Sequence, residues 1–465
     1  MGKKSFWLIF LVSLCIRLIG SGQSFWLDEG SSIVLARLPL GGLFRALKGD
    51  FHPPLFYFLL HLWLPIAGHS EWLIRIPFII VGSLCPPVLY QLLLQLFGKE
   101  KRNVSLMAAL LLMFNPLSIY YSTELRMYSL NALLSLLSWL YLTRWMKKIN
   151  HRPSAIYYLF FSLANIYTFY GALLNLVSQS VFVIWKHKKK FKSFVICNLV
   201  IGLLFLPWVP TLISQLSGSD YLSRADSLSF KSLGLIMAKF TIGRISLVNK
   251  SAYAIFVAGI SLYFLLCSYL VSLTKEGRAL LIWFYSSIAT AIIVSLWTPI
   301  LGYWHYIFLI PPFVSIITFG LNQLPKEAYW LNLLAVLLIF LSGNIFFFST
   351  PMFQREDWRA AAKVISVDRS LTIVNFPDVF APLKFYAPNV YFYPDQESLG
   401  KIRPDLDQSL PLILSGKETV FVIDYLSDLT DKKRSILSWL SRAGFNEQPT
   451  HNINGVGFIY EFKAP

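Results

Sequence analysis

Long apolar runs separated by short polar stretches dominate the first 349 residues of the chain. Eleven runs are long enough to cross about 30 Å of hydrocarbon at a helical rise of about 1.5 Å per residue. They begin at Phe6, Trp72, Val104, Met127, Ala155, Gly171, Ser193, Ala252, Ala279, His305 and Tyr329. This pattern predicts an all-α polytopic membrane protein with about 11 transmembrane helices.

A further apolar run, from Pro53 to Ala67, is too short to be a clear span. Basic residues accumulate on the cytoplasmic side of membrane proteins. With Lys3 and Lys4 inside, counting this run as a span would place every later basic cluster outside. We therefore expect a juxtamembrane or re-entrant helix within one external loop, residues 20–71. The chain would then be a multi-pass protein of the plasma (inner) membrane whose C-terminus is extracytoplasmic.

The pattern changes after Ser349. Helix-like periodicity at 358–365 and 432–443 alternates with strand-like segments at 371–375, 419–425 and 455–462. This predicts a small α/β domain. We expect two domains: a transmembrane catalytic domain, 1–349, and an extracytoplasmic α/β domain, 350–465.

Composition excludes an ordinary soluble enzyme, because 55% of the 465 residues are hydrophobic and only 14% are charged. The net charge of +17 would suggest nucleic-acid binding if the basic residues formed one patch. Residues 1–349 hold 28 Lys and Arg against 10 Asp and Glu, whereas residues 350–465 hold 13 against 14. The excess falls in short clusters between apolar runs, which favours membrane lipids and no nucleic acid as partners.

Acidic residues in the apolar part are candidates for function, because charge is costly near hydrocarbon. Seven of the ten fall on the predicted external side: Asp28, Glu29, Asp50, Glu71, Glu124, Asp220 and Asp226. Asp28 and Glu29 follow the first span directly. The structural alternative is that Asp28 is the N-cap of the next helix and Glu29 interacts with its dipole.

Histidine and arginine side chains share the external loops with these acids. Pro53 and Pro54 fix the turn that carries His52, and Arg126 stands at the start of a span, where snorkelling alone would explain it. His305 lies near the tenth span. The tail contains Asp405-Leu406-Asp407, which resembles the Asp-x-Asp of nucleotide-sugar enzymes, but no strand precedes it and we expect no such role.

Together these motifs resemble a known family. The Asp-Glu pair, His-Pro-Pro-Leu-Phe-Tyr at 52–57, Glu-x-Arg-Met-Tyr at 124–128 and Glu-Asp-Trp-Arg at 356–359 are similar to bacterial relatives of the protein O-mannosyltransferases and of the aminoarabinose transferases of lipid A. The resemblance is strongest over residues 20–130 and only general over 190–300. It implies the GT-C fold and a glycosyltransferase that moves a sugar, such as mannose or arabinose, from a polyprenyl-phosphate carrier.

The resemblance also implies roles for single residues. Asp28 would accept the proton of an acceptor hydroxyl or amine in a single inverting displacement, with Glu29 in support. Arg126, His52 and His305 would bind the donor phosphate. The substrate pocket would include Trp26, Tyr57, Glu124, Tyr128 and Tyr306. The acceptor would be a protein, a lipid or a glycan.

Two alternatives stay open at this point. A divalent metal held by His52, His305 and a carboxylate would replace phosphate binding by His52; no other cofactor is expected. A polytopic transporter or lipid-linked sugar flippase would also need many spans, but matched broken helices are not found in the two halves of the sequence. A non-catalytic scaffold would explain the tail but not the three loop motifs.

Overall fold

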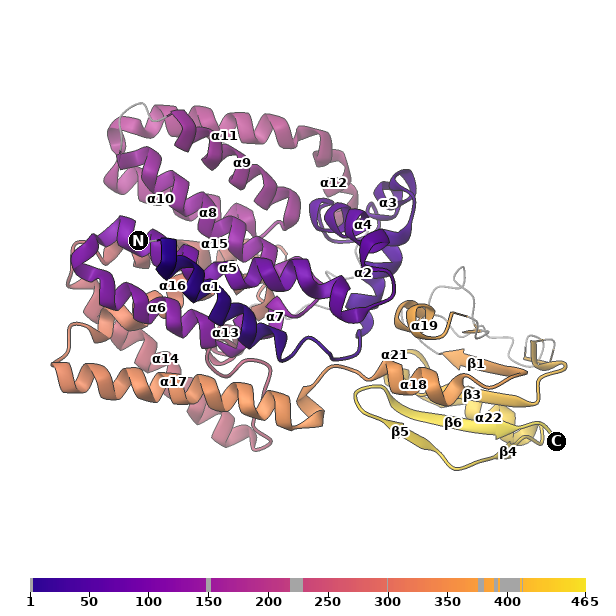
Figure 1. Ribbon diagram of the computed structural model, residues 1–465. Helices are drawn as coiled ribbons and strands as arrows, with labels where there is room; N and C mark the ends of the chain where they lie inside the picture. The colour runs from indigo at the N-terminus through magenta and orange to yellow at the C-terminus, as the bar shows by residue number, and fades with distance from the viewer. Residues whose placement is uncertain are drawn as a thin grey trace. The chain divides into compact units, whose positions relative to one another are not determined.

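The computed structural model describes residues 3–147, 152–217, 229–298, 300–374, 380–388, 392–393, 410–411 and 413–465. Asp220, Asp226 and the Asp405–Asp407 motif lie outside these residues. The described chain is mostly helical with one sheet, and it folds as two compact units (Figure 1). The first comprises Met1–Ser21, Pro39–Ile66 and Trp72–Ser349; the second comprises Gly22–Leu38, Ala67–Glu71 and Thr350–Pro465.

Each of the eleven apolar runs forms a helix or a pair of consecutive helices. These are α1 (Lys3–Leu18), α5 (Glu71–Phe97), α6 (Arg102–Phe114) with α7 (Pro116–Ser122), α8 (Tyr128–Lys147), α9 (Arg152–Thr168), α10 (Ala172–Lys186), α11 (Phe191–Phe205) with α12 (Val209–Ser217), α14 (Lys250–Ser272), α15 (Arg278–Val294), α16 (Ile310–Leu321) after a 3-10 turn, and α17 (Lys326–Ser349).

Five helical segments of the described chain are long and apolar enough to cross a membrane: Glu71–Phe97, Lys188–Leu216, Lys250–Ser272, Tyr303–Leu321 and Lys326–Ser349. A sixth would be α6 with α7, which meet at 57°. The bend lies at Asn115, whose side chain caps α7 by accepting from the Ser118 amide, before Pro116 at the first helical position. The expected number of eleven spans is therefore not confirmed, because several runs form shorter or interrupted helices.

The first unit is built around α16, every residue of which is buried. α14, α15 and α6 pack against it, α8 packs along α9, and α10 packs against α15. The approach of α14 needs Gly320, where a Cβ atom would lie 2.5 Å from the Cys267 carbonyl oxygen. One further helix, α13 (Phe230–Ile242), was not predicted.

The first predicted external loop contains α2 (Leu27–Arg37), α3 (Leu40–Ala46) and α4 (Leu55–Ala67). The helix expected after Pro53 is α4, and it begins directly behind the two prolines. The loop is divided between the compact units, because residues 22–38 belong to the second and residues 39–66 to the first.

The second unit contains a six-stranded mixed sheet in the order β2-β1-β3-β6-β4, with β5 also pairing with β6. The strands are β1 (Ser370–Val374), β2 (Phe392–Tyr393), β3 (Thr419–Ile423), β4 (Asn446–Glu447), β5 (His451–Ile453) and β6 (Gly457–Lys463). β1 runs parallel to β2 and β3, whereas β6 is antiparallel to its neighbours. The predicted tail sheet is thus present.

Helices cover both faces of this sheet. α18 (Trp358–Ile365) and α19 (Phe380–Tyr386) lie over the face that carries Val374, Phe421 and Ile459, and α22 (Ser435–Arg442) lies over the other. A short helix, α21 (Ser427–Thr430), follows β3.

α2 packs against α19 in the same unit. A Cβ atom on Gly30 would lie 2.5 Å from the Pro382 nitrogen, so the two backbones touch. The side chain of Leu27 joins the core under α18. This unit is therefore larger than the domain expected from the sequence, because α2 finds its partners more than 300 residues away. The assignment of catalysis to residues 1–349 stays a prediction.

Candidate functional site

The predicted site residues are divided between the two compact units. The second unit contains Trp26, Asp28 and Glu29. The first contains the remaining seven: His52, Tyr57, Glu124, Arg126, Tyr128, His305 and Tyr306. Each set is described within its own unit.

Asp28 and Glu29 lie in the first turn of α2. The helix begins at Leu27 and its N-cap is Trp26, so the alternative that Asp28 is the N-cap is wrong. Glu29 takes the capping role, because its Oε2 accepts from the Trp26 amide at 3.4 Å. Asp28 is half-buried and Glu29 is fully buried.

Two further groups surround this turn. The Arg355 Nε lies 3.7 Å from Glu29 Oε2, and both side chains are buried. The indole Nε1 of Trp26 is buried and finds no acceptor within the part of the chain that the structure describes. Glu29 therefore contacts the Trp26 amide and lies close to Arg355, whereas the indole N–H of Trp26 donates to none of the described residues.

His52 and Asp50 lie on the turn before α4. His52 Nδ1 is 3.4 Å from both carboxylate oxygens of Asp50, and the Tyr57 hydroxyl donates to Asp50 Oδ2 at 2.7 Å. Burial raises the pKa of Asp50, but the charges of His52 and Arg126, together with both hydrogen bonds, hold it well below its ordinary value. The Asp50 carboxylate is thus hydrogen-bonded to His52 and Tyr57, and it interacts electrostatically with Arg126. The sequence marked Asp50 as external but gave it no role.

The end of α12 holds this turn. Gln215 Nε2 donates to the carbonyl oxygens of Leu47 at 2.6 Å and His52 at 3.3 Å. Its Oε1 accepts from the Tyr170 hydroxyl at 2.5 Å, and that hydroxyl accepts from Trp208 Nε1 at 2.9 Å. Both ends of the amide are thus fixed, which fixes the backbone that carries His52.

Phe169 brings three predicted residues together. Its ring stacks on His52 at a centroid distance of 6.4 Å, lies 5.8 Å from His305 and meets Tyr128 edge-on at 5.9 Å. Because Phe169 is one of 38 phenylalanines in the chain, no signal in the sequence distinguishes it.

Both ring nitrogens of His305 are engaged. Nδ1 lies 2.8 Å from the Ile300 carbonyl oxygen, and Nε2 accepts from Trp304 Nε1 at 3.0 Å. The Tyr306 hydroxyl donates to the same Ile300 oxygen at 2.8 Å. These contacts fix the turn before α16, and His305 would exchange one of them to contact a phosphate. Its role as a phosphate contact stays a prediction.

Arg126 and Glu124 are buried in the turn between α7 and α8. Arg244, which the sequence did not indicate, lies in the same region. Its guanidinium stacks over Tyr120 at 5.1 Å, its Nη1 donates to the Tyr303 hydroxyl at 2.6 Å, and its charge interacts with Glu124. Arg244 falls where the family resemblance is only general, so no motif could have found it.

Within the described ranges, no three His, Cys, Asp or Glu side chains are close enough together to hold a metal ion. The set of His52, His305 and a carboxylate is therefore not found there, and the metal alternative gains no support.

Comparison with known proteins identifies the fold. Residues 51–213 match the sequence model of the dolichyl-phosphate-mannose-protein mannosyltransferase family. The structure is similar to that of ArnT from Cupriavidus metallidurans bound to undecaprenyl phosphate, with a TM-score of 0.64 and 12% identity over 99% of this chain and 98% of that chain. The chain has the GT-C fold.

Other GT-C structures agree. ArnT in the apo state matches with a TM-score of 0.62 and 13% identity, over 100% of this chain and 99% of that chain. The Archaeoglobus fulgidus oligosaccharyltransferase tethered with an acceptor peptide matches with a TM-score of 0.54 and 12% identity, over 99% and 74%. No curated protein matches the sequence. The resemblance to GT-C glycosyltransferases that use polyprenyl-phosphate sugars is thus confirmed.

Proposed function

We propose that the protein transfers a sugar from a polyprenyl-phosphate carrier to an acceptor at the external face of the plasma membrane. The observation that carries this proposal is the cluster of Arg126, His52, Asp50 and Tyr57, in which Arg126 and Tyr57 are buried and His52 and Asp50 are half-buried. Arg126, His52 and Tyr57 fall inside the stretch that matches a lipid-phosphate-mannose family. The fold agrees over nearly the whole chain with a protein bound to a polyprenyl phosphate.

The cluster suits the phosphate of the donor. Arginine binds phosphate oxygens through two parallel N–H groups, which also offsets the charge of the departing group. Asp50 orients the imidazole of His52 through Nδ1, so that Nε2 would contact the phosphate. We favour this role for His52 over metal binding, and Tyr128 and Tyr306 would line the adjoining pocket.

Asp28 would act as the base. The acceptor oxygen or nitrogen bonds to the anomeric carbon, the bond from that carbon to the phosphate oxygen breaks, and Asp28 takes the acceptor proton in a single inverting displacement. The phosphate leaves already ionised, so the reaction needs no strong acid. The unused indole N–H of Trp26 would donate to a substrate hydroxyl.

The acceptor is proposed at the level of class. Protein, lipid and glycan hydroxyls would all be suitable nucleophiles, and the match to an oligosaccharyltransferase tethered with an acceptor peptide gives specific support to a protein. The C-terminal unit would lie outside the cell with the acceptor.

Transfer of radiolabelled sugar from a panel of polyprenyl-phosphate donors by the purified protein tests the proposal. Asp28→Asn should lower kcat by about 100-fold or more, the usual contribution of a general base. Asp368→Asn, which changes an exposed carboxylate, is the matched control and should leave kcat unchanged. Near-normal transfer by Asp28→Asn would contradict the assignment of Asp28 as the base. Movement of labelled lipid across proteoliposomes without sugar transfer would instead support a transporter.

A further inference from the structure

The segment that opens α18 lies along the segment that leads into α2. The Arg355 amide donates to Gln23 Oε1 at 3.2 Å, the Arg359 amide donates to Ser24 Oγ at 3.1 Å, and Arg359 Nη2 donates to the Gly22 carbonyl oxygen at 3.0 Å. Successive hydrogen bonds of this kind fix both backbones. The start of the tail therefore holds the chain between the first span and Asp28.

Glu356 is the centre of this contact. Its Oε2 accepts from the Leu27 amide at 3.2 Å and from Trp358 Nε1 at 2.6 Å, and its Oε1 accepts from the Tyr425 hydroxyl at 2.6 Å. Leu27 is the first residue of α2 and directly precedes Asp28. One carboxylate thus joins the first turn of α2 to two aromatic side chains of the tail.

Those aromatic side chains belong to a packed core. Trp358 is fully buried, and its ring meets that of Tyr425 at 5.1 Å. The side chain of Leu27 packs against the same core. Because close-packed interiors resist displacement, the position of Glu356 is set by the sheet unit as a whole.

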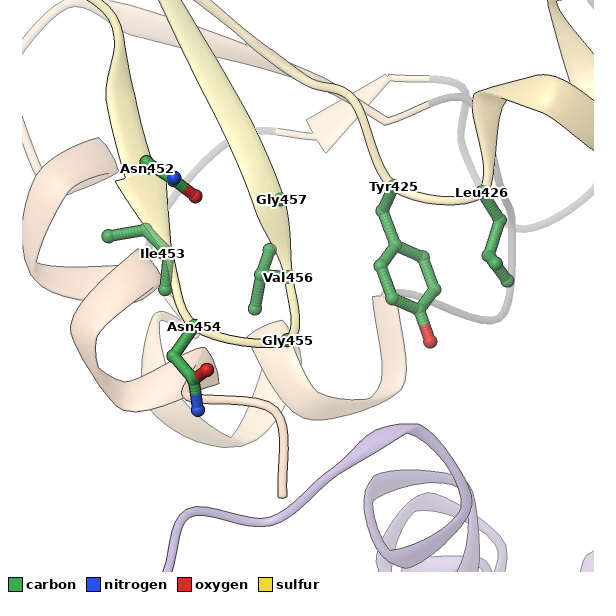
Figure 2. Close-up of a pocket in the computed structure, with 8 residues that line it drawn as sticks. All are labelled: Tyr425, Leu426, Asn452, Ile453, Asn454, Gly455, Val456 and Gly457. Carbon is green, nitrogen blue, oxygen red and sulfur yellow. The ribbon is translucent and has the colours of Figure 1, made fainter. Parts of the chain in front are cut away.

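The turn between β5 and β6 supports Glu356 from the other side. Gly455 has a φ of +72°, and a Cβ atom on it would lie 2.8 Å from the Glu356 Cα. The Asn454 carbonyl oxygen accepts from the Asp357 amide at 2.9 Å. Figure 2 shows this turn and Tyr425 lining an open hollow. Among the described residues that line the hollow, Tyr425 is the one titratable side chain, and its hydroxyl donates to Glu356.

We propose that Glu356 is a positioning residue, which orients Asp28 by holding the first amide of α2 on the core of the C-terminal unit. The inference rests on the proposed role of Asp28 as the base. It gives the tail a function that an acceptor-binding accessory domain would not have: its first helix sets the geometry of the reacting carboxylate.

The three hydrogen bonds to Glu356 depend on its oxygen atoms as acceptors more than on its charge. Burial raises the pKa of Glu356 and the neighbouring charge of Asp28 raises it further, while the hydrogen bonds oppose this. A glutamine could still accept from Leu27 and Trp358 through its oxygen and donate to the Tyr425 oxygen. An alanine would remove the shared acceptor of all three donors, so the two substitutions should differ.

The test compares Glu356→Ala and Glu356→Gln with Glu418→Ala, which changes an exposed glutamate paired with Arg369 on the surface of the same unit. Glu356→Ala should lower kcat by about 10- to 100-fold, the effect of a misplaced reacting group, with the KM for the lipid donor unchanged. Glu356→Gln and Glu418→Ala should stay within about 2-fold of the natural protein. Hydrogen exchange of peptides from residues 22–30 should be faster in Glu356→Ala alone.

Combination with Asp28→Asn separates failure of this inference from failure of the proposed function. If Glu356 acts through Asp28, adding Glu356→Ala to Asp28→Asn should not lower the residual transfer further. Two results would overturn the inference and leave the proposed function unaffected. The first is that Glu356→Ala lowers transfer by the same factor in the natural protein and in Asp28→Asn. The second is that Glu356→Ala has the kcat of the natural protein while Asp28→Asn is inactive. Normal transfer by Asp28→Asn overturns both the inference and the proposed function.

A folding failure of Glu356→Ala has its own control. Tyr425→Phe removes one donor to Glu356 and keeps the ring in the core. In that case a several-fold loss of kcat at constant KM in Tyr425→Phe supports the inference, and an unchanged kcat contradicts it.

Discussion

Asp50 illustrates, at the scale of single residues, how the pKa of a half-buried carboxylate depends on its neighbours. Its folded pKa lies below the ordinary value of 3.8, so the folded protein binds this proton less readily than the unfolded chain does. The resulting contribution to the free energy of unfolding is fully present above about pH 4 to 5. It is lost as the pH falls from there through the folded pKa.

Replacement of Asp50 by Asn should therefore change both stability and its pH dependence. We expect the free energy of unfolding at neutral pH to fall by about 2 kcal/mol, because His52, Tyr57 and Arg126 lose a charged partner. The melting temperature in detergent should also fall less steeply between pH 5 and pH 3 than in the natural protein. Melting curves across this range give the comparison, with the exposed Glu418→Gln as control. If the melting temperatures of Asp50→Asn and of the natural protein fell equally steeply with pH, the lowered pKa of Asp50 would be contradicted.

The sequence indicated residues whose type is rare in an apolar chain. It did not indicate residues that are distinguished only by their contacts in the folded structure. Asp28, Glu29 and Arg126 are conspicuous because charges near spans are few. Asp50 had a signal, two residues from His52 on the same turn. Glu356 lay in a motif, but its bond to Leu27 joins positions 329 residues apart, which no local pattern reveals.

Close backbone contact between α2 and α19 provides a test at the scale of elements. Gly30→Ala would place a Cβ atom 2.5 Å from the Pro382 nitrogen and 2.9 Å from the Ala381 carbonyl carbon. The gain in helix propensity is about 1 kcal/mol, but overpacking against backbone costs about 1 to 3 kcal/mol, so the clash should win. We expect a lower melting temperature and slower transfer.

Gly41 offers a matched control for Gly30. It lies in α3 of the same loop, and nothing lies within 4 Å of a Cβ atom built on it. Gly41→Ala should therefore keep or slightly raise the melting temperature by improving helix propensity. Thermal unfolding of both variants in the same detergent measures the contrast. Equal effects of the two substitutions would show that α2 does not depend on its contact with α19.

The length of the apolar runs predicted the positions of the helices better than it predicted which helices cross the membrane. Each predicted apolar run forms a helix or a pair of helices in the structure. The sequence did not predict α13, because Lys239 interrupts its apolar pattern. The structure shows why the lysine is tolerated: its Nζ donates to the carbonyl oxygens of Arg244 and Ile245 and to Ser246 Oγ, just beyond the helix end. Burial and the charge of Arg244 lower the pKa of Lys239 to about 8.

The whole molecule has a direction across the membrane that labelling can measure. The expected topology places five spans between Lys189 and Lys433, so these exposed residues should lie on opposite sides. In a chain without native cysteines, Lys433→Cys should react with an impermeant maleimide in intact spheroplasts, and Lys189→Cys only after permeabilisation. Reaction of both without permeabilisation would mean an even number of crossings, as if α13 were one more.

The change in composition at Ser349 coincides with one boundary between the two compact units. The membership of α2 in the second unit was not predicted from the sequence. Its pattern is that of any amphipathic helix in an external loop, and only the three-dimensional contacts with Glu356 and α19 assign it to the second unit.

The long sequence separation between α2 and its support has a consequence for biosynthesis. A ribosome that adds about 5 to 20 residues per second needs roughly 15 to 65 s to proceed from Leu27 to Glu356. Under the proposed function, the nascent chain would meet lipid-linked sugar during that interval while the turn that carries Asp28 still has no contact with Glu356. The protein would thus gain activity only when translation is nearly finished, so prematurely terminated chains would not consume the donor.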